Sequence, residues 1–222
     1  MPQVAVLFDV DGVLTDSYRP HFLSWQRLMS ELDVEFTEEN FRATFGRTNP
    51  DIFQQLYPGE LSAARMAELG ERKEVLYREI IQQEFYPMPG AVELVDALAA
   101  YGFLLGVGSS GPPENVALTL AKLDRAERFA AVITGADVTR GKPEPEVFLK
   151  GAERLGLPPA QCAVIEDAPQ GIEAANRAGM TSIAITGTAP REALAHAKLV
   201  IDSHAELSPG RIAELINSNG SH

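Results

Sequence analysis

Short runs of apolar residues recur along most of the chain, and helical patterns separate them. The apolar positions in these runs are continuous rather than alternating, as in parallel strands that are covered on both faces. This alternation of strand and helix predicts a doubly wound parallel α/β sheet. The predicted strands are Val4–Phe8, Phe103–Val107, Ala131–Thr134, Cys162–Ile165, Ser182–Ile185 and Leu199–Ile201. The predicted helices of this part are Ala91–Ala100, Asn115–Leu123, Glu146–Leu155, Gln170–Ala178, Arg191–Ala195 and Ala205–Ile216.

The pattern changes between residues 17 and 85, where no run is typical of a strand. Apolar residues recur there at helical spacing, which predicts an all-helical insert directly after the first strand. The segment "YPMPG", residues 86–90, then marks the return to alternating strands and helices. We therefore expect an α/β core domain made of residues 1–16 and 87–222, and a small α-helical domain made of residues 17–86.

The composition predicts a folded chain that binds neither nucleic acid nor a membrane. Apolar residues make up 45% of the 222 residues, and the net charge of −12 repels nucleic acid and anionic lipid. No apolar stretch is long enough to span a bilayer, and Asp9 and Asp11 interrupt the first apolar run too early for a signal peptide. The one cysteine, Cys162, excludes a disulfide within the chain. We expect a cytoplasmic monomer.

Polar side chains follow the predicted strands where those strands end. Because the carboxyl ends of parallel strands meet at one edge of an open sheet, where ligands bind, we expect these side chains to converge. A lysine at the start of a predicted helix, in "GKPEPEVF", is expected at the same edge. The residues concerned are Asp9, Asp11, Ser109, Ser110, Lys142, Glu166 and Asp167.

Four carboxylates in one small volume repel one another strongly, and a divalent cation relieves that repulsion. Carboxylate oxygens, a backbone carbonyl and water suit Mg²⁺, which usually binds together with a substrate phosphate. A lysine and a hydroxyl nearby suit phosphate oxygens. The cluster therefore predicts a Mg²⁺-dependent phosphoryl-transfer site.

Four short motifs in this order resemble those of the haloacid dehalogenase-like (HAD) phosphotransferases. They are "DVDGV", Ser109, "GKP" with Lys142, and "EDAPQG", and the resemblance extends from Val4 to about Asp202. The helical insert after the first motif resembles the small α-helical cap of that family. The resemblance implies a phosphatase that acts on a small phosphorylated metabolite.

The resemblance also implies roles for the residues of the first motif. Asp9 would be the nucleophile that forms an aspartyl-phosphate. Asp11 would protonate the leaving alcohol and then activate water, which favours phosphate esters as substrates. Asp9 and the backbone carbonyl of Asp11 would also bind Mg²⁺. Gly12 would let the backbone approach the substrate closely.

The remaining motifs would bind the phosphoryl group and the metal. Ser109, with Ser110 beside it, would hydrogen-bond phosphoryl oxygens, and Lys142 would neutralise charge on Asp9 and on the transferred group. Glu166 and Asp167 would hold Mg²⁺, directly or through water. Taken singly, each motif has a structural alternative, such as a turn at Asp11-Gly12, a helix cap at Ser109 or a surface lysine at Lys142.

Within the family, the insert resembles the cap of β-phosphoglucomutases and of related phosphatases, including phosphoglycolate phosphatases. The resemblance implies substrate contacts for His21, Trp25 and Lys73, although Trp25 also fits a cap core and Lys73 a solvated helix face. At Asn49 the mutases carry an arginine that holds a second phosphate, and Arg47 stands nearby. The loss of that arginine favours a phosphatase over a sugar-phosphate mutase, which remains the alternative. A further departure is Ala168, where relatives often have serine.

A second class of function is a dinucleotide-dependent oxidoreductase. The segment "GVGSSG", Gly106 to Gly111, matches a phosphate-binding glycine pattern between a predicted strand and a predicted helix. The match falls on the second strand of the sheet rather than the first, and two prolines crowd the helix start. It also leaves the acidic residues and Lys142 unexplained.

Overall fold

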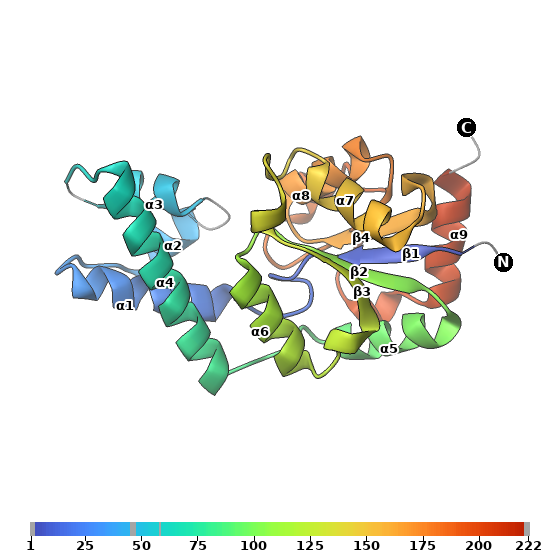
Figure 1. Cartoon of the computed structure of the whole chain (residues 1–222), viewed down its shortest axis with the longest axis horizontal. Coiled ribbons are helices and arrows are strands. Elements are labelled where there is room, and N and C mark those ends of the chain that lie inside the picture. The colour runs from blue at the N-terminus through green and yellow to red at the C-terminus, as the bar shows by residue number, and fades with distance from the viewer. Residues whose placement is uncertain (1–2, 45–47, 58, 220–222) are drawn as a thin grey trace. The chain divides into compact units, whose positions relative to one another are not determined.

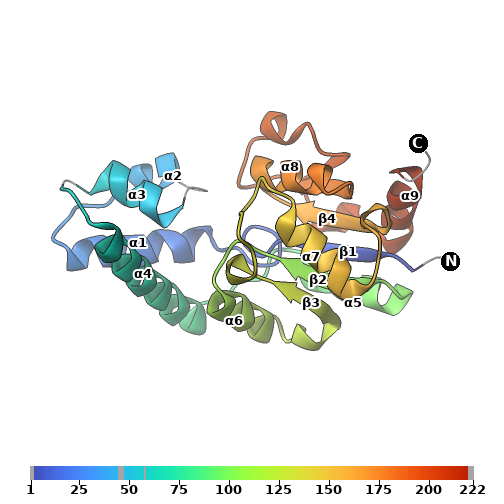
Figure 2. The ribbon, with the colours of Figure 1, turned by 45° about the horizontal axis from the view of Figure 1, so that its top comes forward.

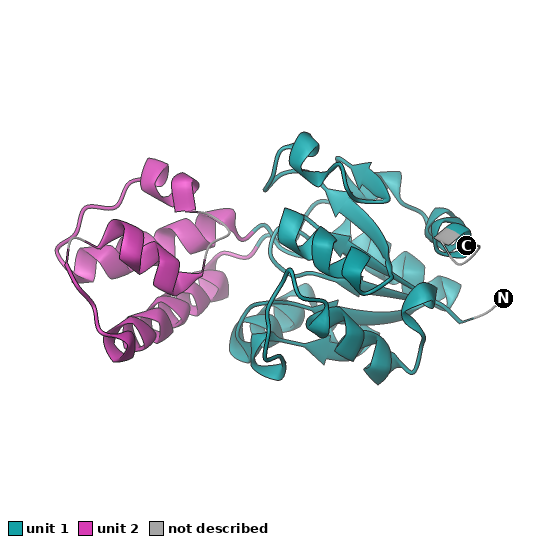
Figure 3. Cartoon of the chain, turned by 90° about the horizontal axis from the view of Figure 1, so that it is seen from above, with its two compact units in different colours: residues 1–16, 86–222 teal, residues 17–85 magenta. Residues whose placement is uncertain are grey.

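The computed structural model describes residues 3–44, 48–57 and 59–219, and the chain divides into two compact units (Figure 3). One unit contains Met1–Asp16 and Tyr86–His222, and the other is Ser17–Phe85. The second unit is the stretch in which the hydrophobic pattern predicts only helices. Its role as a cap stays a prediction.

The larger unit is built on a sheet of six parallel strands in the order β3-β2-β1-β4-β5-β6. The chain starts in the middle of the sheet, winds outward to β3, and then returns to the other side of β1. The predicted doubly wound fold is confirmed. The strands are β1 (Ala5–Phe8), β2 (Leu104–Gly108), β3 (Phe129–Ile133), β4 (Cys162–Glu166), β5 (Thr181–Ile185) and β6 (Leu199–Ile201).

Burial along the strands explains why the apolar runs are continuous. Every residue of β1, β4 and β5 is buried, whereas the edge strands β3 and β6 are partly exposed. Helices α7 (Glu146–Leu155) and α8 (Pro169–Arg177) cover one face, and α5 (Ala91–Tyr101) and α9 (Pro209–Asn219) cover the other (Figure 1). With both faces covered, most positions of the central strands are filled by apolar side chains.

The structure corrects two of the predicted helices. Residues 191–195 form only a short 3₁₀ turn, Arg191–Leu194. The predicted helix Ala205–Ile216 is broken into a 3₁₀ turn, His204–Glu206, and α9. The break has a local cause, because Pro209 lacks the N–H that a continuous helix needs and disfavours helical geometry at Ser208.

The glycines of "GVGSSG" have a packing reason rather than a nucleotide-binding one. Gly106 and Gly108 lie inside β2. A Cβ at Gly106 would stand 2.5 Å from the Leu7 side chain, and one at Gly108 would stand 2.8 Å from the Phe148 ring. Helix α6 (Pro113–Leu123) begins only after a further loop. Nothing in this geometry supports the oxidoreductase alternative.

The smaller unit contains four helices in its described part (Figure 2). Their apolar faces form a core of their own that includes Trp25, Phe41 and Phe53. Helices α1 and α4 make the most extensive contact within the unit. The helices are α1 (Tyr18–Glu31), α2 (Glu38–Thr44), α3 (Asn49–Leu56) and α4 (Ala63–Gln83).

The chain leaves the larger unit and returns to it along two segments that are hydrogen-bonded to each other. The Asp16 N–H donates to the Tyr86 carbonyl at 2.9 Å, and the Thr15 hydroxyl donates to the same oxygen at 3.1 Å. The Met88 N–H donates to the Leu14 carbonyl at 3.0 Å. These bonds hold the start and the end of the helical insert together.

Across residues 3–44, 48–57 and 59–219, no helix has the length and apolar character that crossing a membrane requires.

Cys162 should be inert in the native protein. It lies fully buried on β4, and burial raises the pKa of its thiol to about 11. A thiol reagent at pH 8 should therefore react at least about 100-fold more slowly with the native chain than with the chain in guanidinium. Counting bound label over time measures this difference. Complete labelling of the native protein within minutes would contradict it.

Candidate active site

The register of the central strands brings the first carboxylates together. Phe8 at the end of β1 pairs with Val107 of β2 on one side and with Ile165 of β4 on the other. The next residue, Asp9, donates its N–H to the Ile165 carbonyl at 3.0 Å. Asp9 and Glu166 therefore stand side by side where the winding of the sheet reverses, which is the place where open α/β sheets bind ligands.

Lys142 joins these two acids. Its ammonium donates to Asp9 Oδ1 at 2.6 Å, to Glu166 Oε1 at 2.7 Å and to the Gly108 carbonyl at 3.0 Å. The three acceptors match the three N–H donors of a lysine. The ammonium also lies 4.9 Å from the centre of the Phe148 ring. A surface role for Lys142 is wrong, since only 8% of its side chain is exposed.

The cluster holds more negative charge than Lys142 balances. Burial raises the pKa of Asp9 to about 7; Lys142 opposes this rise, and the charges of Glu166 and Asp11 add to it. Burial also raises the pKa of Asp167 well above its usual range, with Glu166 and Asp9 adding to the rise. Burial alone would lower the pKa of Lys142, but the two carboxylates raise it well above its ordinary value, so Lys142 stays cationic.

Glu166 is fixed on both of its oxygens. Oε1 accepts from Lys142, and Oε2 accepts from the backbone N–H groups of Asp167 at 2.8 Å and Ala168 at 2.9 Å. Gly171 on α8 lies so close that a Cβ there would overlap the carboxyl group. This geometry favours Glu166 as the residue that positions Lys142, with any metal contact indirect. Ala168 supplies its backbone N–H, which needs no serine side chain.

Asp167 lies against the first motif. Gly12 has a φ of +71°, and a Cβ on it would overlap the Asp167 carboxylate and stand 2.8 Å from the Thr188 hydroxyl. Thr188 hydrogen-bonds Asp167 and opposes the rise of its pKa. Asp11 is only partly buried, but its charge acts on both Asp9 and Asp167. Glycine at position 12 is therefore required both by its backbone conformation and by the close approach of Asp167.

Ser109 and Ser110 follow the end of β2 and differ in burial. Ser109 is 1% exposed, and its N–H donates to the Ile133 carbonyl at 3.0 Å. Its hydroxyl oxygen accepts from the Gly111 N–H at 3.0 Å, which orients the O–H group. Ser110 is exposed. The Ser109 hydroxyl is therefore held in place at the end of β2, next to the end of β1 where Asp9 lies.

The predicted cap residues form a second cluster, within the helical unit. Lys73 Nζ lies 2.8 Å from His21 Nδ1 and 6.0 Å from the centre of the Trp25 ring. Lys73 is buried, so a solvated helix position is wrong. Trp25 is also buried, in the core of the unit, which favours its packing role. Asn49 and Lys73 both donate to Glu74, and Arg47 lies outside the described residues.

The oxygen ligands of the cluster fit Mg²⁺, but they do not form a complete coordination shell by themselves. Within the described ranges, no three histidine, cysteine or acidic side chains are arranged to hold a metal ion. Mg²⁺ needs only one or two carboxylates when water and a substrate phosphate complete its octahedron. Burial raises the pKa of both Asp9 and Asp167, and the neighbouring charges of Glu166 and Asp11 add to both rises. This excess of negative charge is the imbalance that a divalent cation removes.

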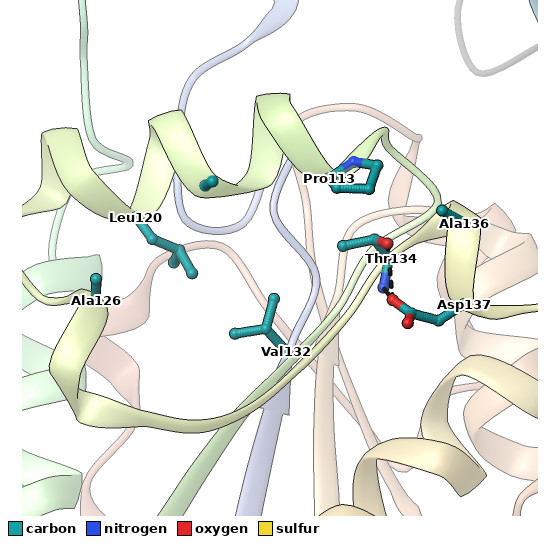
Figure 4. A pocket seen from close by; sticks show the side chains of 8 residues that line it. Pro113, Leu120, Ala126, Val132, Thr134, Ala136 and Asp137 are labelled. Carbon is teal, nitrogen blue, oxygen red and sulfur yellow. Dashed lines mark hydrogen bonds between the residues drawn. The ribbon is translucent and has the colours of Figure 1, made fainter.

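A hollow of about 470 Å³ lies apart from this cluster, beside the edge strand β3 (Figure 4). Small apolar side chains of α6 and of the β3 region line most of it, with Thr134 and Asp137 at one end. Those two polar groups are bonded to each other at 2.8 Å. None of the sequence-predicted site residues lines this hollow, and we place the active site at the acidic cluster.

Sequence reasoning missed several residues that shape the two clusters. Phe148, Gly171 and Thr188 touch Lys142, Glu166 and Asp167, and Glu74 joins Lys73 to Asn49. Gly171 alone carried a signal, because it lies inside "EDAPQG", one residue after the start of the predicted helix Gln170–Ala178. The others depend on contacts between distant segments.

A doubly wound sheet with buried acids and a lysine at its switch point defines an α/β enzyme with its site at the carboxyl ends of the strands. A family model described as haloacid dehalogenase-like hydrolase matches residues 4–179. The chain belongs to the haloacid dehalogenase-like hydrolase family, as its motifs predict.

Relatives within the family include a mutase and a phosphatase. The chain is 30% identical over 212 residues to β-phosphoglucomutase of Bacillus subtilis, covering 92% of this chain and 91% of the relative. It is 33% identical over 209 residues to validoxylamine A 7'-phosphate phosphatase of Streptomyces hygroscopicus subsp. limoneus, covering 90% and 94%. The crystal structure of β-phosphoglucomutase from Clostridium difficile matches with a TM-score of 0.83 at 26% identity, covering 97% and 98%.

Proposed function

We propose that this hydrolase is a Mg²⁺-dependent phosphatase that cleaves a small phosphorylated metabolite through an aspartyl-phosphate on Asp9. The observation that carries the proposal is the Lys142 ammonium, which holds Asp9 Oδ1 at 2.6 Å and Glu166 Oε1 at 2.7 Å at the switch point of the sheet. A buried lysine bound to a buried carboxylate is suited to stabilise the charge of a transferring phosphoryl group.

In the first step, Asp9 attacks phosphorus through Oδ2, because Lys142 holds Oδ1. The bond between phosphorus and the ester oxygen breaks, and the leaving alkoxide takes a proton from Asp11. The hydroxyl of Ser109 donates a hydrogen bond to a phosphoryl oxygen, and Lys142 balances the charge that develops on the group. The alcohol then leaves with the proton of Asp11.

In the second step, water attacks the phosphorus of the aspartyl-phosphate. Asp11, now ionised, takes one proton from this water, and the bond between phosphorus and Asp9 Oδ2 breaks. Inorganic phosphate leaves, and Asp9 returns as a carboxylate. Both steps use Asp11 as the same proton carrier, first as an acid and then as a base.

Asp9, Asp167 and the backbone carbonyl of Asp11 are the groups we assign to Mg²⁺. When bound, Mg²⁺ supplies positive charge that keeps both acids ionised and screens the approaching phosphate from them. Glu166 contributes indirectly, because it positions Lys142 and binds the backbone N–H groups of the loop that carries Asp167.

A sugar-phosphate mutase is the second candidate, and the similarity to a β-phosphoglucomutase over nine tenths of the chain favours it. A mutase must hold a sugar bisphosphate intermediate while that intermediate reorients in the site. Asn49 stands where the mutases have the arginine for that second phosphate, and its amide is engaged with Glu74 at 3.0 Å. We therefore favour water as the acceptor.

That the protein is a monomer and that it acts in the cytoplasm both stay predictions.

Phosphate release should depend on Mg²⁺. In a panel of metabolite phosphates, at least one compound should be hydrolysed with millimolar Mg²⁺, and excess EDTA should lower the rate at least about 100-fold by leaving the acid cluster uncompensated. Adding back Mg²⁺ should restore the rate.

The same panel separates the two candidates if it includes β-glucose 1-phosphate and if glucose 6-phosphate is measured beside free phosphate. Isomerisation that outruns release would make the protein a mutase. Absence of any turnover, or turnover that EDTA leaves unchanged, would contradict the proposed chemistry.

A further inference from the structure

Glu74 on α4 is a largely covered carboxylate to which the motifs assign no role. Only 14% of its side chain is exposed. Its Oε1 accepts from Lys73 Nζ at 3.1 Å and from Asn49 Nδ2 at 3.0 Å. One carboxylate oxygen thus ties together two of the residues that were predicted to contact substrate, across helices α3 and α4.

The contacts fix the donor and acceptor roles of the groups in this cluster. An ammonium has donors only, so the 2.8 Å contact between Lys73 Nζ and His21 Nδ1 makes Nδ1 the acceptor. In the neutral imidazole the proton then sits on Nε2, which is a donor. The ring of His21 is held in place by stacking on Tyr77, with centroids 4.1 Å apart. Asn49 donates through Nδ2, so its Oδ1 is an acceptor.

Glu74 also decides the charge of the cluster. The Lys73 ammonium alone would attract an anion, but the carboxylate 3.1 Å away balances it. A phosphate brought to this cluster would gain attraction to Lys73 and suffer repulsion from Glu74 at nearly the same distance. A neutral hydroxyl suffers no such repulsion and can use both donors and acceptors.

We propose that Glu74 sets the specificity of this enzyme for monophosphates of neutral, hydroxyl-rich molecules and against bisphosphates. The inference rests on the proposed function and adds to it that the helical unit contributes to substrate selection. The carboxylate acts by neutralising Lys73 and by holding Asn49, so the cluster of His21, Asn49, Lys73 and Glu74 binds hydroxyl groups rather than a second phosphate.

The test compares two competitors in the hydrolysis of p-nitrophenyl phosphate, glucose 6-phosphate and glucose 1,6-bisphosphate. The wild type should be inhibited more strongly by the monophosphate. Glu74→Gln keeps the shape and removes the charge, and it should lower the ratio of the bisphosphate inhibition constant to the monophosphate one about tenfold. Glu74→Asp, which keeps the charge, should stay closer to the wild type than Glu74→Gln does.

Glu71→Gln is the matched control, since Glu71 is exposed on the same helix and the substitution changes the net charge equally. It should leave the ratio unchanged. If Glu74→Gln does not fold, Lys73→Met gives the reciprocal test and should raise the ratio.

Three results would overturn the inference: equal effects of the Glu74 and Glu71 substitutions, a wild type that binds the bisphosphate as tightly as the monophosphate, or no inhibition by either sugar phosphate. In each of these the wild type still releases nitrophenol. A wild type that releases none at all would instead contradict the proposed function.

Discussion

Asp9→Asn should lower phosphate release at least about 10⁴-fold, the scale of loss when a nucleophile is removed. The amide has the shape of the carboxylate, but it does not attack phosphorus. The fold should survive, because burial already disfavours the ionised form of Asp9, whose pKa is raised to about 7. The melting temperature should stay within roughly 4 °C of that of the wild type.

Two measurements make this result specific to Asp9. Asp16→Asn is the matched control, because Asp16 is exposed and lies seven residues further along the same segment. It should keep full activity. Acid quenching during turnover should trap phosphate on the peptide that contains Asp9 in the wild type, and not in Asp9→Asn. Trapping on another residue would move the nucleophile elsewhere.

Lys142→Met should weaken both catalysis and folding. Loss of the ammonium removes charge stabilisation worth about 10²–10³ in kcat. It also leaves Asp9 and Glu166 as buried acids without their shared partner, and breaking such a pair costs about 3–5 kcal/mol in the free energy of unfolding. Kinetics with Mg²⁺ present measure the first effect, and denaturant unfolding in the presence of EDTA measures the second.

The loss of stability in Lys142→Met should depend on pH in a definite direction. Burial already raises the pKa of Asp9 while Lys142 opposes that rise, so removing the lysine raises it further. A carboxyl whose pKa is higher in the folded state binds more protons there, and the free energy of unfolding then falls as pH rises. From pH 5 to pH 8 the variant should therefore lose more stability than the wild type.

Lys150→Met is the control for the lysine substitution. Lys150 pairs with Glu146 at 2.9 Å, but 40% of its side chain is exposed, so the pair is screened by water. Its removal should cost less than about 1 kcal/mol and should leave kcat unchanged. Equal losses of stability in Lys142→Met and Lys150→Met would contradict the structural role of Lys142.

The sequence predicts well which polar residues come together, because these residues follow the ends of strands. Asp9, Ser109 and Glu166 each follow a strand whose apolar run is visible in the sequence, and parallel pairing brings them to one edge. Lys142 lies on a loop, and its predicted place at this edge rests on the start of the following helix and on its motif. Gly12 is likewise predicted from its place in the first motif.

Other features depend on contacts that no local pattern records. Phe148 beneath the Lys142 ammonium and Thr188 beside Asp167 come from distant segments. Trp25 fitted both a ligand contact and a packed core, and helical spacing alone does not separate these two. The broken helix near residue 208 is the opposite case. Pro209 is a local signal for the break, but the helical spacing of the apolar residues predicts one continuous helix there.

The hydrogen bonds between residues 14–16 and residues 86–88 have a consequence for how such a chain diversifies. They join the two strands of chain at the point where the insert leaves the larger unit, so the segment between them can change without breaking these hydrogen bonds. Under the proposed function, changes confined to the residues between them should alter which metabolite is selected and leave the geometry around Asp9 and Lys142 unchanged.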